Sequence, residues 1–257
     1  MNAERTRLAA RLHLEAVFPA LEDLTALSPQ GQGLGHNRMV VVQAGEEGKV
    51  CFRSQEGRLV RVDCAAGGRQ AIGLDFRNSV ALVRAAEGKL VLPRMVGLAR
   101  HPLALVRLIL LLKRLDSTLK SEATNRRELI LQAGLLLIIS LRASAVLVEG
   151  DAICRRILGG MPTGVVKLSV ADGSLGPHFV EHLDGRIALH GEGMNGRENV
   201  EICFQNADTL GGILRDRMDS HAAVASGSVR VRGLLPLADG LGMILDRVAH
   251  YLPVGDG

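Results

Sequence analysis

The sequence predicts an α+β fold built from two similar domains, each a mainly antiparallel sheet of five strands packed with helices. One observation is an internal repeat, because a shift of 128 residues aligns Met39–Leu82 with Lys167–Leu210 without a gap. A second is the order of segments, in which short stretches of alternating hydrophobicity lie between apolar helices. These observations divide the 257 residues into predicted domains at 1–118 and 119–257.

The repeat is stronger than chance. Ten of its 44 aligned positions are identical, whereas unrelated sequences of ordinary composition would match at about three. Four of the ten are glycines at predicted turns, and self-similarity at a fixed offset is a signature of repeated architecture. The identical pairs are Val42/Val170, Gly45/Gly173, Gly48/Gly176, Gly57/Gly185, Arg58/Arg186, Gly68/Gly196, Arg69/Arg197, Phe76/Phe204, Asn78/Asn206 and Leu82/Leu210.

Each predicted domain opens with an apolar helix, at Thr6–Leu27 and at Arg127–Leu158, the second broken near Gly150. Asp23 and Asp151 occupy equivalent positions late in these segments. Three pairs of equivalent dipeptides follow, and their glycines favour two-residue hairpins, because such turns require positive φ angles. The dipeptides are Ala44-Gly45/Asp172-Gly173, Glu56-Gly57/Asp184-Gly185 and Gly67-Gly68/Asn195-Gly196.

Three turns in each domain predict four strands in an antiparallel meander. The fourth strand alternates Ile72, Leu74 and Phe76 with other residues, and Val200, Ile202 and Phe204 repeat this pattern, which gives one buried face and one wetter face. The predicted strands are Met39–Gln43, Val50–Ser54, Arg58–Cys64 and Arg69–Phe76, and then Val165–Ala171, His178–His182, Arg186–Gly191 and Arg197–Phe204.

An asparagine follows each fourth strand. Asn is a favoured helix N-cap, so Asn78 and Asn206 should each begin a short helix. A fifth strand is predicted in each domain, and an apolar helix ends each. These segments are Lys89–Leu92 and Ser228–Arg232 for the strands, and Leu98–Leu115 and Leu237–Leu252 for the helices.

Composition narrows the classes of function. Aromatic residues make up only 2% of the chain, with one tyrosine and no tryptophan, so stacking platforms for single-stranded nucleic acid are nearly absent. The net charge of +4 is compatible with an anionic partner such as a membrane surface. The four cysteines form no CxxC pattern and are expected to be reduced and mostly buried. The N-terminus has no apolar signal region, so we expect a cytoplasmic protein.

Two apolar segments meet part of the pattern of a membrane span. Leu129–Val148 is long enough to span, but polar residues including Arg142 interrupt it, and Leu103–Leu115 is too short. We expect both to be amphipathic or buried helices, with a true span at Leu129–Val148 as the alternative, since a central arginine costs about 2.5–3.5 kcal/mol.

The order of elements resembles the sterol carrier protein type 2 family. The second domain carries the resemblance most clearly: the strand Val200–Phe204 leads into a helix at Asn206, then into Gly227-Ser-Val-Arg-Val-Arg-Gly233 and a terminal amphipathic helix. In the first domain, Gly88-Lys-Leu-Val-Leu-Pro93 replaces that motif. The resemblance implies a twisted sheet covered by helices, an apolar cavity between them that holds lipid, and no cofactor or chemistry of its own.

The candidate ligand-binding residues lie on the fourth strands and on the helices that follow. Core packing is the simpler interpretation of each of these apolar side chains, and it overlaps with a cavity wall. The candidates are Ile202, Phe204, Leu210, Leu214, Met218, Leu241, Met243 and Ile244 in the second domain, and Phe76, Leu82, Leu105 and Ile109 in the first.

Charged and nucleophilic residues give no catalytic pattern. His178 and His182 share a face of a predicted strand, where residues four apart are too distant for one zinc ion, and the first domain lacks them. No nucleophile elbow or P-loop is present. Arg100, Arg107 and Arg114 repeat every seven residues, either as the solvated edge of a core helix or as a contact for anionic lipid.

The sequence therefore predicts a non-enzymatic carrier of a lipid or other hydrophobic ligand. The alternative is a scaffold or accessory protein whose filled cores mediate self-association, or contact with a partner or a membrane surface. A homodimer is compatible with either function, and no nucleic-acid partner is expected. Cavity volume distinguishes the two, since a carrier needs an open apolar space.

Overall fold

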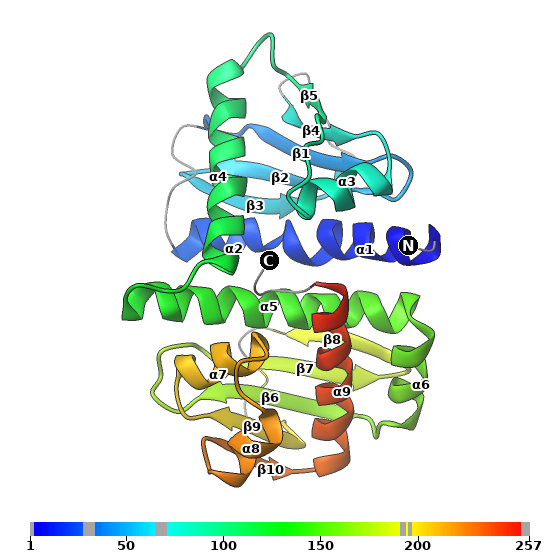
Figure 1. Cartoon of the computed structure of the whole chain (residues 1–257), viewed down its shortest axis with the longest axis vertical. Helices are drawn as coiled ribbons and strands as arrows, with labels where there is room; N and C mark the ends of the chain where they lie inside the picture. The colour runs from blue at the N-terminus through cyan, green and yellow to red at the C-terminus, as the bar shows by residue number, and fades with distance from the viewer. Residues whose placement is uncertain (1–2, 28–33, 65–70, 191–193, 195–196, 253–257) are drawn as a thin grey trace. The chain divides into compact units, whose positions relative to one another are not determined.

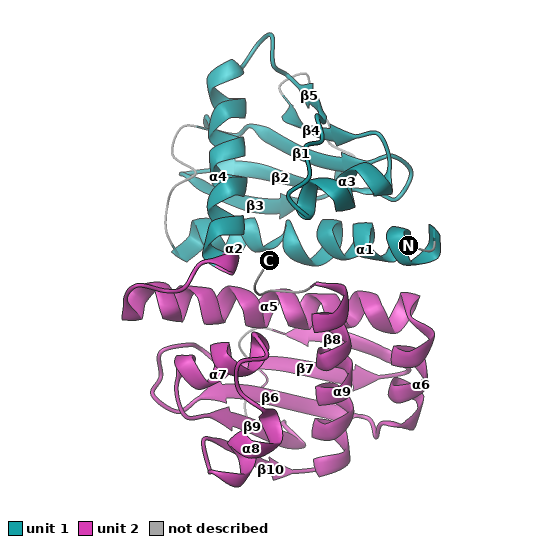
Figure 2. Cartoon of the chain, viewed as in Figure 1, with its two compact units in different colours: residues 1–118 teal, residues 119–257 magenta. Residues whose placement is uncertain are grey.

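The computed structural model describes residues 3–27, 34–64, 71–190, 194 and 197–252. The chain divides into two compact units, unit 1 at Met1–Thr118 and unit 2 at Leu119–Gly257 (Figure 2). Each unit has a five-stranded sheet and its own helices (Figure 1). The fold class is therefore α+β.

Unit 1 begins with a helical region interrupted by a π-helical turn, followed by strands and two further helices. Its elements are α1 (Ala3–Leu12), η1 (His13–Val17), α2 (Ala20–Leu27), β1 (Met39–Ala44), β2 (Lys49–Gln55), β3 (Arg58–Val62), β4 (Ile72–Phe76), α3 (Ser79–Ala86), β5 (Arg94–Val96) and α4 (Pro102–Lys120).

Unit 2 begins with the longest described helix and ends with a helix that crosses its sheet in Figure 1. Its elements are α5 (Arg126–Gly150), α6 (Ala152–Gly160), β6 (Gly164–Val170), β7 (His178–Leu183), β8 (Arg186–His190), β9 (Val200–Phe204), α7 (Ala207–Leu214), α8 (Ser220–Ala225), β10 (Val229–Gly233) and α9 (Leu235–Tyr251).

Both sheets are mixed, so the predicted antiparallel meander is wrong. The strand orders are β3-β2-β1-β4-β5 and β10-β9-β6-β7-β8. The fourth strand of each sheet runs parallel to the first, with Val42 opposite Leu74 and Leu168 opposite Ile202. The other pairings are antiparallel. The third predicted turns, at Gly67-Gly68 and Asn195-Gly196, lie outside the described residues, but β3–β4 and β8–β9 are not neighbours.

The first predicted two-residue hairpins, at Ala44-Gly45 and Asp172-Gly173, are wrong, because Gln43 pairs with Lys49 and Leu168 with His178, which leaves longer connections. The second predicted hairpin turn is confirmed in both units. Glu56 and Gly57 have φ angles of 49° and 80°, and Asp184 and Gly185 have 51° and 69°. Both central residues thus adopt the left-handed conformation that two-residue hairpins of the primed type require. These turns fix the β2–β3 and β7–β8 registers, with Gln55 opposite Arg58 and Leu183 opposite Arg186.

One strand predicted in unit 1 is corrected. Lys89–Leu92 is not a strand, and β5 starts beyond Pro93 at Arg94. Leu90 and Leu92 of this predicted strand are 94% and 84% exposed, because no sheet neighbour covers them.

The expectation of reduced cysteines is wrong for two of the four. Cys51 and Cys64 form a disulfide with a Cα–Cα distance of 5.4 Å. Cys51 lies opposite Val62 in the β2–β3 ladder, and Cys64 follows two residues later, so the pairing brings the two thiols together. Cys154 and Cys203 are free, the first buried and the second half-buried.

The helix that follows each parallel strand starts at the predicted cap. The side chain of Asn78 accepts a 2.9 Å hydrogen bond from the Ala81 backbone N–H, and Asn206 accepts an equivalent bond of 2.9 Å from Thr209. Because these bonds satisfy otherwise unpaired N–H groups, the two asparagines fix where α3 and α7 begin.

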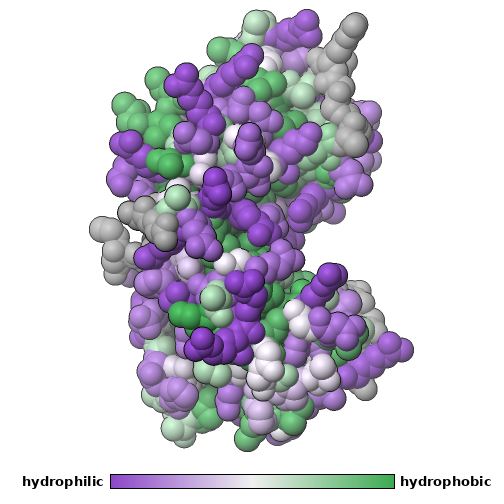
Figure 3. Space-filling model, turned by 90° about the vertical axis from the view of Figure 1, so that its right-hand side faces the viewer, coloured by the Kyte–Doolittle hydropathy of each residue, from purple (hydrophilic) through white to green (hydrophobic). Residues whose placement is uncertain are grey.

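Helix α5 is long and apolar enough to cross a membrane by length and composition, and 56% of its most apolar window is buried within the structure. It packs on α7, α9 and β8. A core helix of a folded unit has these properties, which agrees with the expectation of a buried helix at Leu129–Val148. On the face of the molecule drawn in Figure 3, apolar side chains lie among polar ones, as on most protein surfaces.

Candidate functional site

The candidate site of unit 2 is the face of its sheet that carries the apolar side chains of the two central strands. On β6, Val166, Leu168 and Val170 are buried, and the parallel register places them opposite Val200, Ile202 and Phe204 of β9. Helix α9 packs on β6, β9 and β10, and α7 packs on β9. The site is thus a continuous apolar sheet face under two helices.

The structure places most of the predicted ligand-binding residues of unit 2 in this core. Leu210 and Ile244 are fully buried, and Leu241 is 1% exposed. Phe204 is also buried, whereas Ile202 and Leu214 are half-buried. Met218 and Met243 are 36% and 52% exposed and do not belong to the buried part.

Glycines bring the elements of this site close together. A Cβ atom on Gly240 of α9 would lie 2.2 Å from Met161 Cγ, so the thioether side chain takes the space that a larger residue would occupy. Gly233, which ends the motif of the family resemblance, has a φ of 113°, and a Cβ there would lie 2.2 Å from the Asn199 carbonyl oxygen. The backbone at this position therefore requires glycine.

The C-terminal end of α9 is held by a buried carboxylate. Asp151 caps α6 by accepting hydrogen bonds from the N–H groups of Ile153 at 2.8 Å and Cys154 at 3.0 Å. Its other oxygen accepts bonds from the Tyr251 hydroxyl at 2.8 Å and from the Arg247 guanidinium at 3.3 and 3.4 Å. The Arg247 guanidinium also lies 5.4 Å from the Tyr251 ring centroid. This cluster ties α9 to the start of α6.

The electrostatics of the cluster indicate a structural role. Burial acts to raise the pKa of Asp151, but hydrogen bonds from the Cys154 N–H, Tyr251 and Arg247 together hold that pKa below its ordinary value. Burial also raises the pKa of the Cys154 thiol to about 12, with the Asp151 carboxylate acting in the same direction. A thiol in this environment stays protonated and is a poor nucleophile.

In unit 1 the equivalent residues are also mostly buried. Phe76 on β4, Leu82 on α3 and Leu105 on α4 are 5%, 1% and 1% exposed, whereas Ile109 is 38% exposed. Helix α3 packs on β1 and β4. The three predicted anion-contact residues, Arg100, Arg107 and Arg114, are all exposed.

The histidines of β7 and β8 contact protein groups. His182 is buried, and its Nδ1 lies 3.0 Å from the Pro162 carbonyl oxygen, while His190 Nε2 lies 2.8 Å from a Glu181 carboxylate oxygen. Across the described residues, no group of three or more His, Cys, Asp or Glu side chains could hold a metal ion.

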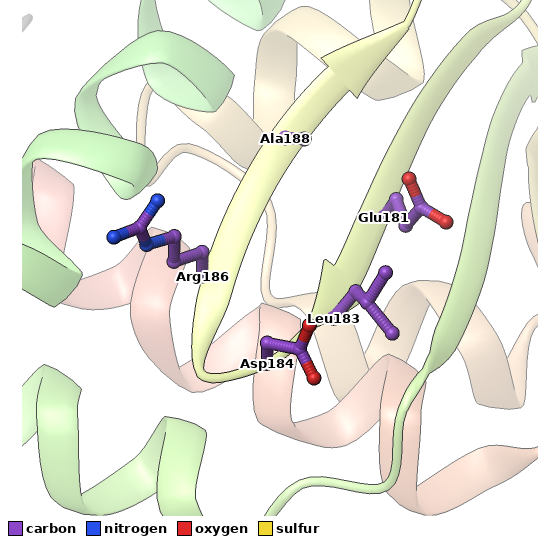
Figure 4. A pocket seen from close by; sticks show the side chains of 5 residues that line it. All are labelled: Glu181, Leu183, Asp184, Arg186 and Ala188. Atoms are coloured by element: carbon purple, nitrogen blue, oxygen red, sulfur yellow. The ribbon is translucent and has the colours of Figure 1, made fainter.

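A pocket of about 400 Å³ lies at the β7–β8 hairpin. Glu181, Leu183, Asp184, Arg186 and Ala188 line it, and in Figure 4 the Arg186 side chain points away from the Glu181 carboxylate. The pocket is at the tip of a turn and not between the sheet and α9, where the apolar site was predicted. Its charged groups do not converge on one point, so it forms no catalytic arrangement.

The comparisons with known proteins find solved structures that are similar to part of this chain. No protein-family model matches the chain, and no curated protein matches it in sequence. A structure described as UbiJ-SCP2, a ubiquinone synthesis protein, is 16% identical, with a TM-score of 0.35, and the match covers 44% of this chain and 96% of that one.

Two further solved structures match over a similar share of this chain. The sterol carrier protein domain 2 of Helicoverpa armigera is 14% identical, with a TM-score of 0.36 and coverage of 45% and 89%. The sec-alkylsulfatase Pisa1 of Pseudomonas is 13% identical, with a TM-score of 0.29 and coverage of 48% and 25%. Each match extends over less than half of this chain.

Sequence reasoning missed the partners of Asp151. The equivalence of Asp23 and Asp151 marked the position, and Tyr251 stood out as the only tyrosine. Nothing in the pattern joined these residues, because they are a hundred positions apart and meet only when α9 has folded over the sheet. The exposure of Leu90 and Leu92 was also missed, because it depends on whether a neighbouring strand pairs with this segment, which the local sequence does not show.

Proposed function

We propose that the protein binds a lipid or another apolar ligand without catalysing a reaction, and that unit 2 holds this ligand between its sheet and α9. The observation that carries the proposal is the division of the sheet into two chemically different faces. Val166, Leu168 and Val170 of β6 are buried, whereas Lys167 and Ser169, which alternate with them, interact with the Glu201 carboxylate. Polar groups therefore lie on the opposite face at β6 and β9, beside the buried Phe179 of β7, which is opposite Lys167.

Burial of an alkyl chain supplies affinity without a charged contact. Each CH₂ group removed from water contributes about 0.8 kcal/mol, so a long chain under α9 would bind through apolar contacts alone. Entry of a ligand requires α9 to move relative to β9.

We further infer that the two units are copies of one sterol carrier protein-like domain, divided after Thr118. The same strand order in both sheets, the matched caps at Asn78 and Asn206, and the equivalent positive-φ turns support this inference. We keep the cytoplasm as the proposed location. Because disulfides are rare there, the oxidation state of Cys51 in cells tests this part of the proposal.

The function is tested by filling the proposed ligand space. Ile244 of α9 and Leu108 of α4 are both fully buried, so Ile244→Phe and Leu108→Phe are matched enlargements in the two units. Ile244→Phe should weaken the binding of a fluorescent fatty acid by about tenfold or more, since the added ring occupies the ligand's place. Leu108→Phe should leave the binding constant within about twofold.

Before binding is compared, circular dichroism spectra should establish that both variants are folded. An equal loss of affinity in the two variants would contradict the assignment to unit 2. Wild-type protein that binds no fatty acid, sterol or other apolar probe would contradict the function itself.

A further inference from the structure

Residues 88–118 of unit 1 concentrate exposed apolar side chains. This stretch, named here the leucine–arginine segment, runs from Gly88 after α3 through β5 and along α4. Of the 16 large apolar side chains that are exposed in the described part of the chain, seven lie within these 31 residues. They are Leu90, Leu92, Leu98, Leu103, Val106, Ile109 and Leu110.

Helix α4 has two apolar faces. One consists of buried residues, Ala104, Leu105, Leu108, Leu111 and Leu115. The other contains Leu103, Val106 and Leu110, whose spacing of three and four residues aligns them along the helix. These three side chains are 78%, 52% and 58% exposed. Helix α4 therefore presents an apolar stripe away from the core that its buried face joins.

The residues before β5 expose two further leucines. Leu90 and Leu92 are 94% and 84% exposed, the highest fractions among the large apolar side chains that the structure describes. These leucines increase the exposed apolar area of the segment, and large exposed apolar patches mark sites of interaction.

The same segment carries the positive charge of the chain. It contains six basic residues, Lys89, Arg94, Arg100, Arg107, Lys113 and Arg114, and a single acidic residue, Asp116, which gives a net charge of +5. Lys89 forms a 2.6 Å ion pair with Glu87, just before the segment, so the other five basic residues carry the argument. The whole protein has a net charge of +4, so the remainder is close to neutral. At 100° per residue, Arg107 and Arg114 flank one side of the apolar stripe and Lys113 flanks the other.

We propose that the leucine–arginine segment docks unit 1 on the surface of an anionic lipid bilayer. Leu90, Leu92 and the stripe Leu103, Val106 and Leu110 would enter the acyl boundary, while the basic residues contact headgroups. A helix with an apolar stripe and a basic margin binds membranes in this way, and each basic residue near an anionic surface contributes attraction.

The chemistry of the segment favours a membrane over a protein partner. Residues 88–118 contain no Phe, Tyr or Trp, whereas the energetic centres of protein interfaces are rich in Trp and Tyr as well as Arg. Helix α9 of unit 2 provides a contrast. It also exposes apolar side chains, Leu235 and Met243, but it carries Asp239 and Asp246 against Arg247 alone, a net charge of −1.

Sedimentation with lipid vesicles tests the proposal on the full chain. Wild-type protein should bind vesicles of phosphatidylcholine and phosphatidylglycerol at least about tenfold more tightly than vesicles of phosphatidylcholine alone, and added salt should weaken this binding. The triple variant Leu103→Ser/Val106→Ser/Leu110→Ser should lose about tenfold or more in vesicle affinity, and so should Lys113→Gln/Arg114→Gln.

The matched control is Leu235→Ser/Met243→Ser, which removes two similarly exposed apolar side chains from α9 and should bind vesicles like the wild type. Ile244→Phe should also bind vesicles normally, which separates docking from the proposed ligand site. Equal binding to both kinds of vesicle, or an equal loss in the α9 control, would overturn the proposal. A dimer that the triple variant converts to a monomer, with vesicle binding unchanged, would instead assign the stripe to contact between copies.

Discussion

The hydroxyl group of Tyr251 donates a 2.8 Å hydrogen bond to Oδ2 of Asp151, a residue one hundred positions earlier in the chain. The same oxygen accepts the Arg247 guanidinium, and the other oxygen caps α6. One buried carboxylate thus joins the beginning of α6 to the last turn of α9. Because α9 covers the proposed ligand site, this contact sets how firmly the site is closed.

Loss of the tyrosine hydroxyl should loosen this closure. Tyr251→Phe removes a hydrogen bond to a charged group, so the free energy of unfolding should fall by about 1.5–3 kcal/mol in urea titrations. Arg126→Gln is the control, because its 3.5 Å ion pair with Asp172 is exposed and contributes less than about 1 kcal/mol. Equal losses in the free energy of unfolding would show that the hydrogen bond to Asp151 stabilises the protein no more than an exposed ion pair does.

The stability of unit 2 should depend on pH through Asp151. Its pKa is below the ordinary value of about 3.9, so the folded state binds this proton less tightly than the unfolded state. The resulting stabilisation is fully present above about pH 5 and is lost as the pH falls below 4 through the lowered pKa. Asp151→Asn should flatten this part of the pH profile in thermal unfolding. A wild-type-like acid slope in the variant would assign the slope to other carboxylates.

Reduction of the Cys51–Cys64 disulfide should destabilise unit 1. The bond closes a loop with a sequence separation of 13 residues, and loops of this length contribute about 3 kcal/mol by restricting the unfolded chain. Cys51→Ala/Cys64→Ala should therefore unfold at a lower denaturant concentration than the oxidised wild type. The difference should largely disappear when the wild type is measured in reducing buffer, and a difference that persists there would trace the effect to lost packing.

The two asparagine caps should contribute similar amounts to the free energy of unfolding. Asn78→Ala and Asn206→Ala should each cost about 1 kcal/mol and increase amide hydrogen exchange in the first turns of α3 and α7. Replacement by Asp, which also caps helices well, should restore the protection. Faster exchange in the Asp variants would show that the amide groups of the asparagines have another role.

Gly233 should tolerate no side chain. Gly233→Ala would place a Cβ at 2.2 Å from the Asn199 carbonyl oxygen with a φ of 113°, so we expect a loss of at least about 1–3 kcal/mol in chemical unfolding. Gly242→Ala in α9 is the matched change, since no atom lies within 4 Å of its added Cβ, and it should stabilise the helix by about 1 kcal/mol. Similar responses at the two glycines would contradict the close approach of β10 to Asn199.

Local features of the fold could be predicted because their causes are local. Glu56-Gly57 and Asp184-Gly185 specify hairpins through backbone preference, and Asn78 and Asn206 specify helix starts through their side-chain oxygens. Strand partners are different, since Ile72, Leu74 and Phe76 would alternate in the same way beside β3 or beside β1. The choice of β1 depends on the burial of both central strands in one core, which no single segment records.

The burial of several candidate residues could be predicted from the sequence, whereas their arrangement in space could be predicted less well. Leu241 and Ile244 follow the helical period of a buried face, so their burial could be anticipated. Met243 lies between them in sequence and outside the core, because α9 turns it toward solvent. The Cys51–Cys64 bond could not be anticipated, since it depends on the β2–β3 register.

Native mass spectrometry of the full chain, purified without detergent, tests the central claim most directly. We predict that a fraction of the protein carries a bound lipid or other apolar molecule, that organic extraction releases it, and that Ile244→Phe is purified without it. Wild-type protein that has only its own mass, and that takes up no added fatty acid or sterol, would contradict the account.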